Sequence, residues 1–183
     1  SKKCSWKDLT QTQKLLQNFI SPHTPYKGLL VFHGVGVGKT CTSITIAEGF
    51  KDYLEEKKKK VYVLLKPSIR ENFRKSIINI NKTNLGDEEQ CTGDTYFEEM
   101  GKSFVGANLK KSEDLKKMEK KANKVINKYY DFYGYGEFVG IYKQIESSIK
   151  DKDSKDRRYI LQKKLKEKFS DSVIIIDEAH NIT

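Results

Sequence analysis

The sequence has few cysteines and no long apolar run. Its 183 residues include only Cys4, Cys41 and Cys91, an odd number at wide spacing. Such usage is typical of a reducing compartment and predicts neither a disulfide framework nor a zinc site. No stretch approaches the roughly 20 apolar residues that a membrane-spanning helix needs. Residues 1–6 lack the apolar core of a signal peptide. We therefore expect an intracellular protein without a membrane partner.

Proline is also scarce, whereas charge is abundant. The chain has three prolines, and no internal repeat or Pro/Gly-rich linker divides it. Its length suits one α/β domain with a real core and is too short for two ordinary domains. The 35 Lys and Arg residues outnumber the 25 Asp and Glu, for a formal net charge of +10. This excess favours a polyanionic partner, DNA or RNA, although solubility alone also accounts for lysine-rich surfaces.

Apolar patterning predicts alternating strands and helices. Short apolar runs at residues 29–33 and 61–65 predict two buried strands. Helices are expected over residues 39–54 and from Pro67 onward, and this alternation favours parallel pairing with right-handed crossovers. The branched run at residues 173–176 suits a strand buried on both faces of the sheet. Further helices are expected at residues 112–129, 138–149 and 156–169.

A glycine-rich segment joins the first expected strand to the first expected helix. Glycines let backbone N–H groups approach a triphosphate closely, and the helix N-terminus adds a favourable dipole. Lys39 can reach the β- and γ-phosphates, and the Thr40 hydroxyl can bind Mg²⁺. The strict P-loop pattern wants glycine at position 33, where this chain has His33, but the G-x-G-K-T part is intact. We expect ATP to be held by Gly34, Val35, Gly36, Val37, Gly38, Lys39 and Thr40.

Two acidic residues follow the last expected strand. Asp177 and Glu178 stand at the carboxyl end of residues 173–176, where ligands bind in open α/β sheets. Phosphoryl transfer depends on positioning and charge stabilisation. We therefore expect Asp177 to hold the Mg²⁺ shell and Glu178 to orient the attacking water. This hypothesis requires Lys39 and Asp177 to meet at adjacent strand ends.

The string Asp177-Glu178-Ala179-His180, with the G-x-G-K-T loop, resembles superfamily 2 helicases and translocases. The resemblance implies a RecA-like P-loop fold over residues 29–183, with a mainly parallel sheet and helices on both faces. A glutamine-motif region would precede it at residues 1–28. The resemblance assigns adenine contact to Gln13, with Gln11 as the alternative, and assigns His180 to coupling between nucleotide state and nucleic-acid binding.

Two further segments resemble nucleic-acid elements of that superfamily. Lys66-Pro67-Ser68 is similar to a Swi/Snf-type element, which implies contacts of Lys66 and Ser68 with the nucleic-acid backbone. A lysine at a strand end is also ordinary. Residues 133–138 resemble an element with a Thr-Tyr pair, but Gly134 stands where that element has threonine. The lysines of residues 110–128 are expected to form the solvated face of a helix.

A narrower resemblance lies in residues 19–34, which are similar to helicase-like proteins of nucleocytoplasmic large DNA viruses, including the poxvirus early transcription factor small subunit. It implies viral transcription or genome processing, with the viral transcription machinery as a partner and a location in the virion or at a host cytoplasmic replication site. In the superfamily a second RecA-like domain with arginine fingers follows the D-E-A-H string. The chain ends at Thr183, so we expect it to be incomplete at its C-terminus, to bind nucleotide weakly and to hydrolyse it poorly alone.

Two other functions remain open on the sequence. One is a nucleic-acid-binding subunit whose nucleotide site has decayed. The intact Lys39, Thr40, Asp177 and Glu178 speak against it. The other is a different class of P-loop ATPase, such as a hexameric remodeller or a DNA-packaging motor. The Gln13 element and the D-E-A-H string favour superfamily 2 instead.

Overall fold

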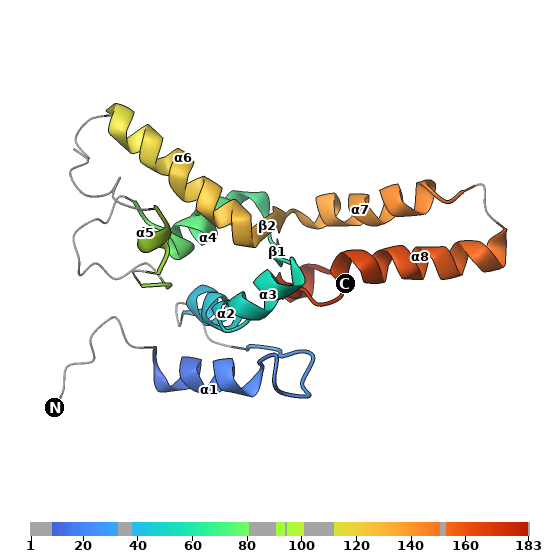
Figure 1. The fold of residues 1–183 in the computed structure, drawn as a ribbon, viewed down its shortest axis with the longest axis horizontal. Coiled ribbons are helices and arrows are strands. Elements are labelled where there is room, and N and C mark those ends of the chain that lie inside the picture. Colours follow the sequence, from blue (N-terminus) through green and yellow to red (C-terminus); the bar gives the residue numbers. More distant parts are fainter. Residues whose placement is uncertain are drawn as a thin grey trace.

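The computed structural model describes residues 9–32, 38–80, 91–93, 95–100, 112–150 and 153–182 (Figure 1). The strands are β1 (Val61–Leu64), β2 (Tyr130–Tyr133) and β3 (Val173–Ile176). Short 3₁₀ helices lie at η1 (Pro67–Ile69) and η3 (Ala179–Ile182). The α-helices are α1 (Gln11–Phe19), α2 (Lys39–Glu48), α3 (Lys51–Lys57), α4 (Arg70–Ile77), α5 (Thr95–Met100), α6 (Ser112–Tyr129), α7 (Tyr135–Ser147) and α8 (Ser154–Phe169).

The three strands form a parallel sheet in the order β2-β1-β3. Val61 pairs with Tyr130 on one side and Val173 on the other, and the register runs without a break to Leu64. All three carboxyl ends therefore meet at one edge. This confirms the predicted α/β class and its parallel pairing.

The core surrounds the central strand. The four residues of β1 are buried because β1 is paired on both edges and covered by helices. Most of the buried helical side chains come from α2, α4 and α6, which lie to the left of the sheet in Figure 1, whereas α7 and α8 extend to its right. They are Ile44, Ala47, Phe73, Ile77, Met118, Ala122, Ile126 and Tyr129, and α3 and α5 add Leu54, Tyr96 and Met100.

Several predicted helices are confirmed. The stripe on residues 112–129 becomes α6, whose apolar positions recur at helical spacing. Helices α7 and α8 match the predictions for residues 138–149 and 156–169 within a few residues. The predicted helix at 39–54 is instead two helices, because α2 ends at its C-cap Gly49 and α3 begins after Phe50.

The predicted strand at residues 29–33 is not found. Residues 29–32 form no strand, and the side chains of Leu30 and Phe32 are 80% and 94% exposed. His33 lies outside the described residues. Apolar character indicates a tendency toward a buried strand, but a strand also needs a hydrogen-bonded neighbour, and residues 29–32 have none in the described sheet.

The predicted burial of residues 173–176 on both faces is also wrong. Ile174 and Ile176 are each 43% exposed, and burial alternates along β3. Among the described strands, β3 pairs with β1 alone and so stands at the sheet's edge. One of its faces packs on the core through Val173 and Ile175, and the other is open.

The cysteines differ from the prediction as well. Cys41 of α2 and Cys91 form a disulfide, with Cα atoms 5.1 Å apart. Cys91 is held there by its N–H, which donates to the Ser76 carbonyl at 2.8 Å. Spacing along the chain did not indicate this pairing, because packing of the segment after α4 against α2 creates it. No helix in the described part of the chain is long and apolar enough to cross a membrane.

Candidate nucleotide site

The first half of the site is the start of α2. Gly38 is its N-cap and has φ +78° and ψ 28°, a left-handed conformation that glycine adopts without steric cost. Lys39 then begins the helix, and the Thr42 N–H donates to the Gly38 carbonyl at 2.9 Å. The predicted phosphate-binding residues Gly34, Val35, Gly36 and Val37 lie outside the described residues.

The second half is the turn after β3. The Asp177 N–H donates to the Leu64 carbonyl at 2.9 Å, which extends the β1–β3 ladder by one residue. The Tyr135 hydroxyl donates to the Asp177 carbonyl oxygen. Glu178 has φ +53°, so the chain turns sharply there. These contacts anchor the Asp177 backbone at the carboxyl edge of the sheet.

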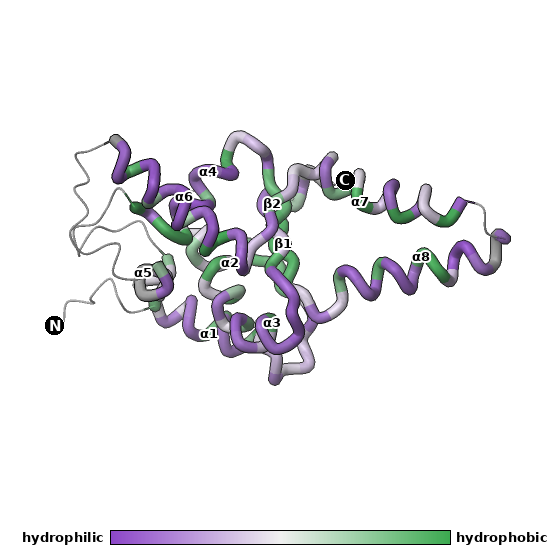
Figure 2. Tube along the Cα trace, turned by 45° about the horizontal axis from the view of Figure 1, so that its top comes forward, coloured by the Kyte–Doolittle hydropathy of each residue, from purple (hydrophilic) through white to green (hydrophobic). Residues whose placement is uncertain are grey.

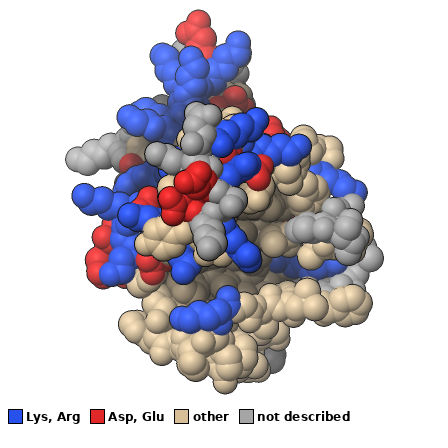
Figure 3. Space-filling view, turned by 90° about the vertical axis from the view of Figure 1, so that its right-hand side faces the viewer, with Lys and Arg blue, Asp and Glu red and all other residues tan. Residues whose placement is uncertain are grey.

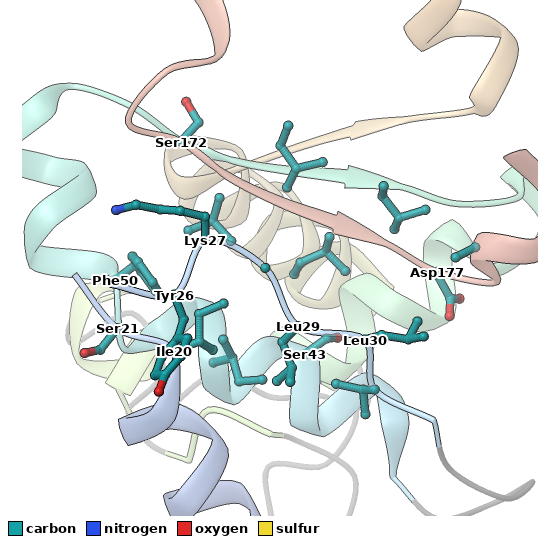
Figure 4. Close-up of a pocket in the computed structure, with 18 of the residues that line it drawn as sticks. Ile20, Ser21, Tyr26, Lys27, Leu29, Leu30, Ser43, Phe50, Ser172 and Asp177 are labelled. Atoms are coloured by element: carbon teal, nitrogen blue, oxygen red, sulfur yellow. The ribbon is translucent and has the colours of Figure 1, made fainter. Parts of the chain in front are cut away.

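One cavity brings the two halves together. Its volume is about 1100 Å³, and it lies between residues 20–32, α2 and β3 (Figure 4). Figure 4 shows Asp177 at one end of the cavity and Tyr26 and Phe50 toward the other. Four predicted site residues line it, namely Lys39, Asp177, Glu178 and His180. Thr40 is not among the lining residues.

The pKa of the Asp177 carboxyl reflects its position in this cavity. Burial raises the pKa of the Asp177 carboxyl above its ordinary value, and the neighbouring Glu178 carboxylate raises it further. The Glu178 backbone N–H and the positive charge of Lys39 act in the opposite direction on that pKa. Partial burial and the adjacent negative charge therefore favour the neutral form of Asp177, and a cation bound beside it would favour the charged form.

The donor set suits Mg²⁺ held partly by substrate. No group of three or more His, Cys, Asp or Glu residues that could hold a metal ion occurs among the described residues. Mg²⁺ does not require such a cage, because it keeps several waters and binds one or two carboxylates plus phosphates. Asp177, with Glu178 beside it, provides that limited set.

His180 lies on η3, next to the acid pair. Its Nδ1 is 3.3 Å from Glu178 Oε2, and its side chain is 72% exposed. The histidine therefore contacts the carboxylate assigned to the attacking water while another part of its ring faces outward.

The predicted adenine contact, Gln13, is occupied in helix capping. Its Oε1 accepts a hydrogen bond from the Thr10 N–H at 2.9 Å, while the Gln13 N–H donates to Thr10 Oγ1 at 3.2 Å. Neither Gln13 nor Gln11 is among the cavity's lining residues. Gln17, which the sequence did not single out, instead ties α1 to α2, because its Nε2 donates to the Thr45 carbonyl at 2.8 Å.

Lys66 and Ser68 stand at the same sheet edge as the acid pair. Both are exposed, and they follow directly on β1 and Leu65. Arg70, just beyond them, pairs with Glu137 of α7 at 2.7 Å. Glu137 also accepts the Gly134 N–H at 2.6 Å. The first turn of α7 thus contacts Arg70, two residues after Ser68, on one side and, through Tyr135, the Asp177 backbone on the other.

Sequence reasoning singled out the segment 133–138 but missed the contacts that Tyr135 and Glu137 make there. Glu137 had a local signal, because an acidic residue three positions after Gly134 fits a helix N-terminus. Tyr135 had a partial signal, since it takes the place of the tyrosine in the Thr-Tyr element that residues 133–138 resemble, but that resemblance did not indicate a contact with Asp177. Its role depends on β2 and β3 lying on either side of β1.

Known proteins similar to this chain are named as helicases of large DNA viruses, which confirms the predicted resemblance. A protein of Acanthamoeba polyphaga mimivirus named "Putative ATP-dependent RNA helicase L377" is 35% identical over 96% of this chain. A second mimivirus protein, "Putative ATP-dependent RNA helicase R563", is 31% identical over 93% of it. "Putative helicase 087L" of Invertebrate iridescent virus 3 is 29% identical over 96%.

The chain corresponds to a small part of each relative. It spans 15%, 24% and 15% of the lengths of these three proteins. No family model and no solved structure matches the chain. The relationship is therefore carried by sequence similarity to the viral proteins, along nearly the whole of this chain.

Proposed function

We propose that this chain is the ATP-binding part of a nucleic-acid-dependent ATPase of the superfamily 2 helicase or translocase class. One observation carries the proposal: Lys39 and the pair Asp177–Glu178 line the same cavity, and the acid pair follows directly on the carboxyl end of β3 in a parallel sheet. In open α/β sheets this edge is where ligands bind. The fold is proposed to be RecA-like, with residues 29–183 as the ATP-binding domain and residues 1–28 as the glutamine-motif region.

Each proposed role follows from chemistry that the residue can perform. Lys39, at the start of α2, supplies a positive charge to the β- and γ-phosphates, and the helix N-terminus adds its dipole. Asp177 and the Thr40 hydroxyl hold Mg²⁺, which neutralises phosphate charge and orients the phosphates when bound. Glu178 orients the attacking water and accepts its proton. Residues 34–38 contribute backbone N–H groups, and Gln13 contacts adenine after releasing its cap on α1.

The proposed partner is nucleic acid. Two of the relatives are named as RNA helicases and a third simply as a helicase. This supports a DNA or RNA substrate here, contacted by Lys66 and Ser68, with His180 coupling that contact to nucleotide state. Hydrolysis is proposed to need a second RecA-like domain, and the process to be viral transcription or genome processing, in the virion or at a host cytoplasmic replication site.

The test is Lys39→Ala in the full-length protein. Removing the lysine charge from the phosphates should lower nucleic-acid-stimulated ATP turnover at least about 100-fold, the scale for losing one preorganised group that stabilises transition-state charge. Lys75→Ala is the matched control, since Lys75 is exposed on α4 and does not line the cavity. Phosphate release under saturating nucleic acid is the measurement.

Two results would contradict the proposal. Equal turnover in the Lys39→Ala and Lys75→Ala variants would remove Lys39 from the mechanism. If calorimetry found no Mg·ATP binding to the unmodified full-length protein, the alternative of a nucleic-acid-binding subunit with a decayed nucleotide site would replace it.

A further inference from the structure

The helical hairpin α7–α8 extends away from the rest of the protein. Figures 1 and 2 both show the two helices side by side, projecting from the sheet on the side opposite α2, α4 and α6. Within the described side chains of residues 135–169, only Ile149 is buried. The hairpin is thus two helices that mainly cover each other and leave most of their surface open.

One face of α8 is used to hold the hairpin together. Ile160, Leu161 and Leu165 are partly buried at helical spacing, and Phe169 packs on Phe138 of α7 with ring centroids 5.2 Å apart. Arg157 pairs with Glu146 of α7 at 3.6 Å. These contacts explain the apolar residues on the inner side of α8 and give one of its cations, Arg157, an acidic partner.

The solvent-facing side of α8 is mainly basic, although the exposed Asp156 and Glu167 border it, and its cations make no ion pair with a described residue. Arg158, Lys163 and Lys166 are exposed, and no salt bridge joins any of them to a described residue. Tyr159, 69% exposed, and the exposed Gln162 lie among them. Across its sixteen residues α8 carries seven basic and two acidic side chains. Lys and Arg clearly outnumber Asp and Glu on the side of the molecule from which the hairpin projects (Figure 3).

The lysine-rich helix α6 offers an instructive contrast. Its six lysines are mixed with three acidic residues, and they flank a stripe that is buried in the core at Met118, Ala122 and Ile126. The amphipathic role of α6 explains its charged side. α8 contributes no fully buried described residue to the main core, so its outer charges have no such explanation.

The hairpin is fixed where it meets the candidate site. At the start of α7, Tyr135 bonds the Asp177 backbone and Glu137 pairs with Arg70. At the end of α8, the Lys59 ammonium donates to the carbonyls of Glu167 and Lys168. Both ends of the hairpin are therefore held on the body, and the outer face of α8 is presented from a fixed root.

We propose that the outer face of α8, formed by Arg158, Tyr159, Gln162, Lys163 and Lys166, binds the sugar-phosphate backbone of a nucleic acid. The proposal rests on the proposed function, which supplies the polyanion. Arg158 and Lys166 are eight residues apart, so the cations extend along roughly 12 Å of helix. That is enough to contact several consecutive phosphates, and exposed Tyr and Gln side chains also bond phosphate and sugar oxygens. The shared ligand is a phosphodiester chain, whether DNA or RNA.

The experiment compares two triple variants of the full-length protein. Arg158→Gln/Lys163→Gln/Lys166→Gln removes the α8 cations, and Lys116→Gln/Lys117→Gln/Lys120→Gln removes three exposed lysines of α6. Affinity for labelled single-stranded and duplex DNA and RNA is measured by fluorescence anisotropy over a range of salt concentrations. Each phosphate contact contributes about 0.9 to the slope of log K against log salt for duplex, and about 0.7 for single strands.

The α8 variant should lower that slope by about 2 to 3 and weaken binding at 0.15 M salt roughly 10- to 100-fold. The α6 variant should keep the slope of the unmodified protein. Lys163→Arg/Lys166→Arg keeps the charge and should also keep the slope, which separates lost charge from a misfolded hairpin. A decrease in the slope with DNA alone, or with RNA alone, would support the proposal and identify the polymer that α8 binds.

An unchanged slope in the α8 variant would overturn the proposal, and so would an equal decrease in the α6 variant, which would indicate net charge alone. Basal ATP turnover without nucleic acid, measured on the same samples, should be unchanged. A lack of nucleic-acid-stimulated ATP turnover in the unmodified protein would count against the proposed function, whereas the salt slopes would still test the α8 contact.

Discussion

Glu48 is a carboxylic acid placed among aromatic side chains. It lies on the last turn of α2, where it accepts hydrogen bonds from the hydroxyls of Tyr96, at 2.8 Å, and Tyr130. Burial raises the pKa of Glu48 above its usual value, although the two tyrosine hydroxyls and the Lys51 charge act in the opposite direction. The folded protein therefore favours the protonated form of this residue relative to the unfolded chain.

This predicts a specific pH dependence of stability. Because the folded-state pKa of Glu48 is raised, its favourable contribution is fully present below pH 4.5 and is lost as pH rises from there through the folded-state pKa. Glu48→Gln cannot ionise and keeps an oxygen acceptor. Urea denaturation of this chain should show its free energy of unfolding, relative to the unmodified chain, increasing from pH 4.5 upward.

The control is Glu48→Leu, which removes the acceptor as well as the charge. Relative to Glu48→Gln, it should cost about 1–3 kcal/mol at every pH, because the buried Tyr96 and Tyr130 hydroxyls lose their partner and neither variant ionises at this position. A flat difference between Glu48→Gln and the unmodified chain over this pH range would show that Glu48 ionises in the folded protein as it does in water.

At the scale of elements, the disulfide joins α2 to the segment that follows α4, and the sequence did not predict a contact between them. Cys41 lies two residues after Lys39 on α2, and Cys91 follows α4 by fourteen positions. The disulfide closes a loop with a sequence separation of 50 residues. The prediction of unpaired cysteines rested on their number and spacing, which carry no information about which residues the fold brings together.

Reducing this bond should therefore lower stability. A cross-link that closes a loop of this length restricts the unfolded chain, and its loss is expected to cost about 2–4 kcal/mol. Denaturation of this chain with and without dithiothreitol measures the effect. The double variant Cys41→Ser/Cys91→Ser should be insensitive to the reductant. An equal loss of stability on reduction in both proteins would show that the reductant does not act through this disulfide.

Helix α6 and strand β2 differ in how well local sequence patterns predict them. α6 was predicted in full because its apolar positions recur along one face and its first turn carries Glu113 and Asp114. β2 was not predicted, because Tyr130-Asp131-Phe132-Tyr133 has neither a continuous apolar run nor a clear turn before it. Its strand conformation depends on pairing with β1, which is a contact between distant parts of the chain.

At the scale of the whole molecule, the open face beside β3 is the main departure from the predicted sheet. Leu30 and Phe32 are exposed, as are Ile174 and Ile176, and all four line the cavity that contains the candidate site. Exposed apolar surface that is gathered in one place promotes association, whereas scattered apolar residues do not.

We therefore expect this 183-residue chain to associate as its concentration rises. Leu30→Ser/Phe32→Ser should shift sedimentation-velocity profiles toward the monomer, because it removes the two most exposed apolar side chains of the cavity. Tyr159→Ser is a fitting comparison, since Tyr159 is also exposed but lies on α8, away from the cavity, and its profile should not change. A monomeric unmodified chain at all concentrations would be inconsistent with an adhesive patch.

The sequence by itself determined the α/β class, the parallel pairing, most helices and the resemblance to viral helicases. These depend on periodicity, apolar runs and short motifs, which act over a few residues. Only the tertiary structure decided that Lys39 and Asp177 share a cavity, that Tyr135 holds the Asp177 backbone, that Cys41 meets Cys91, and that residues 29–32 remain unpaired. Each of these is a contact between segments far apart in the chain, set by strand order and helix packing.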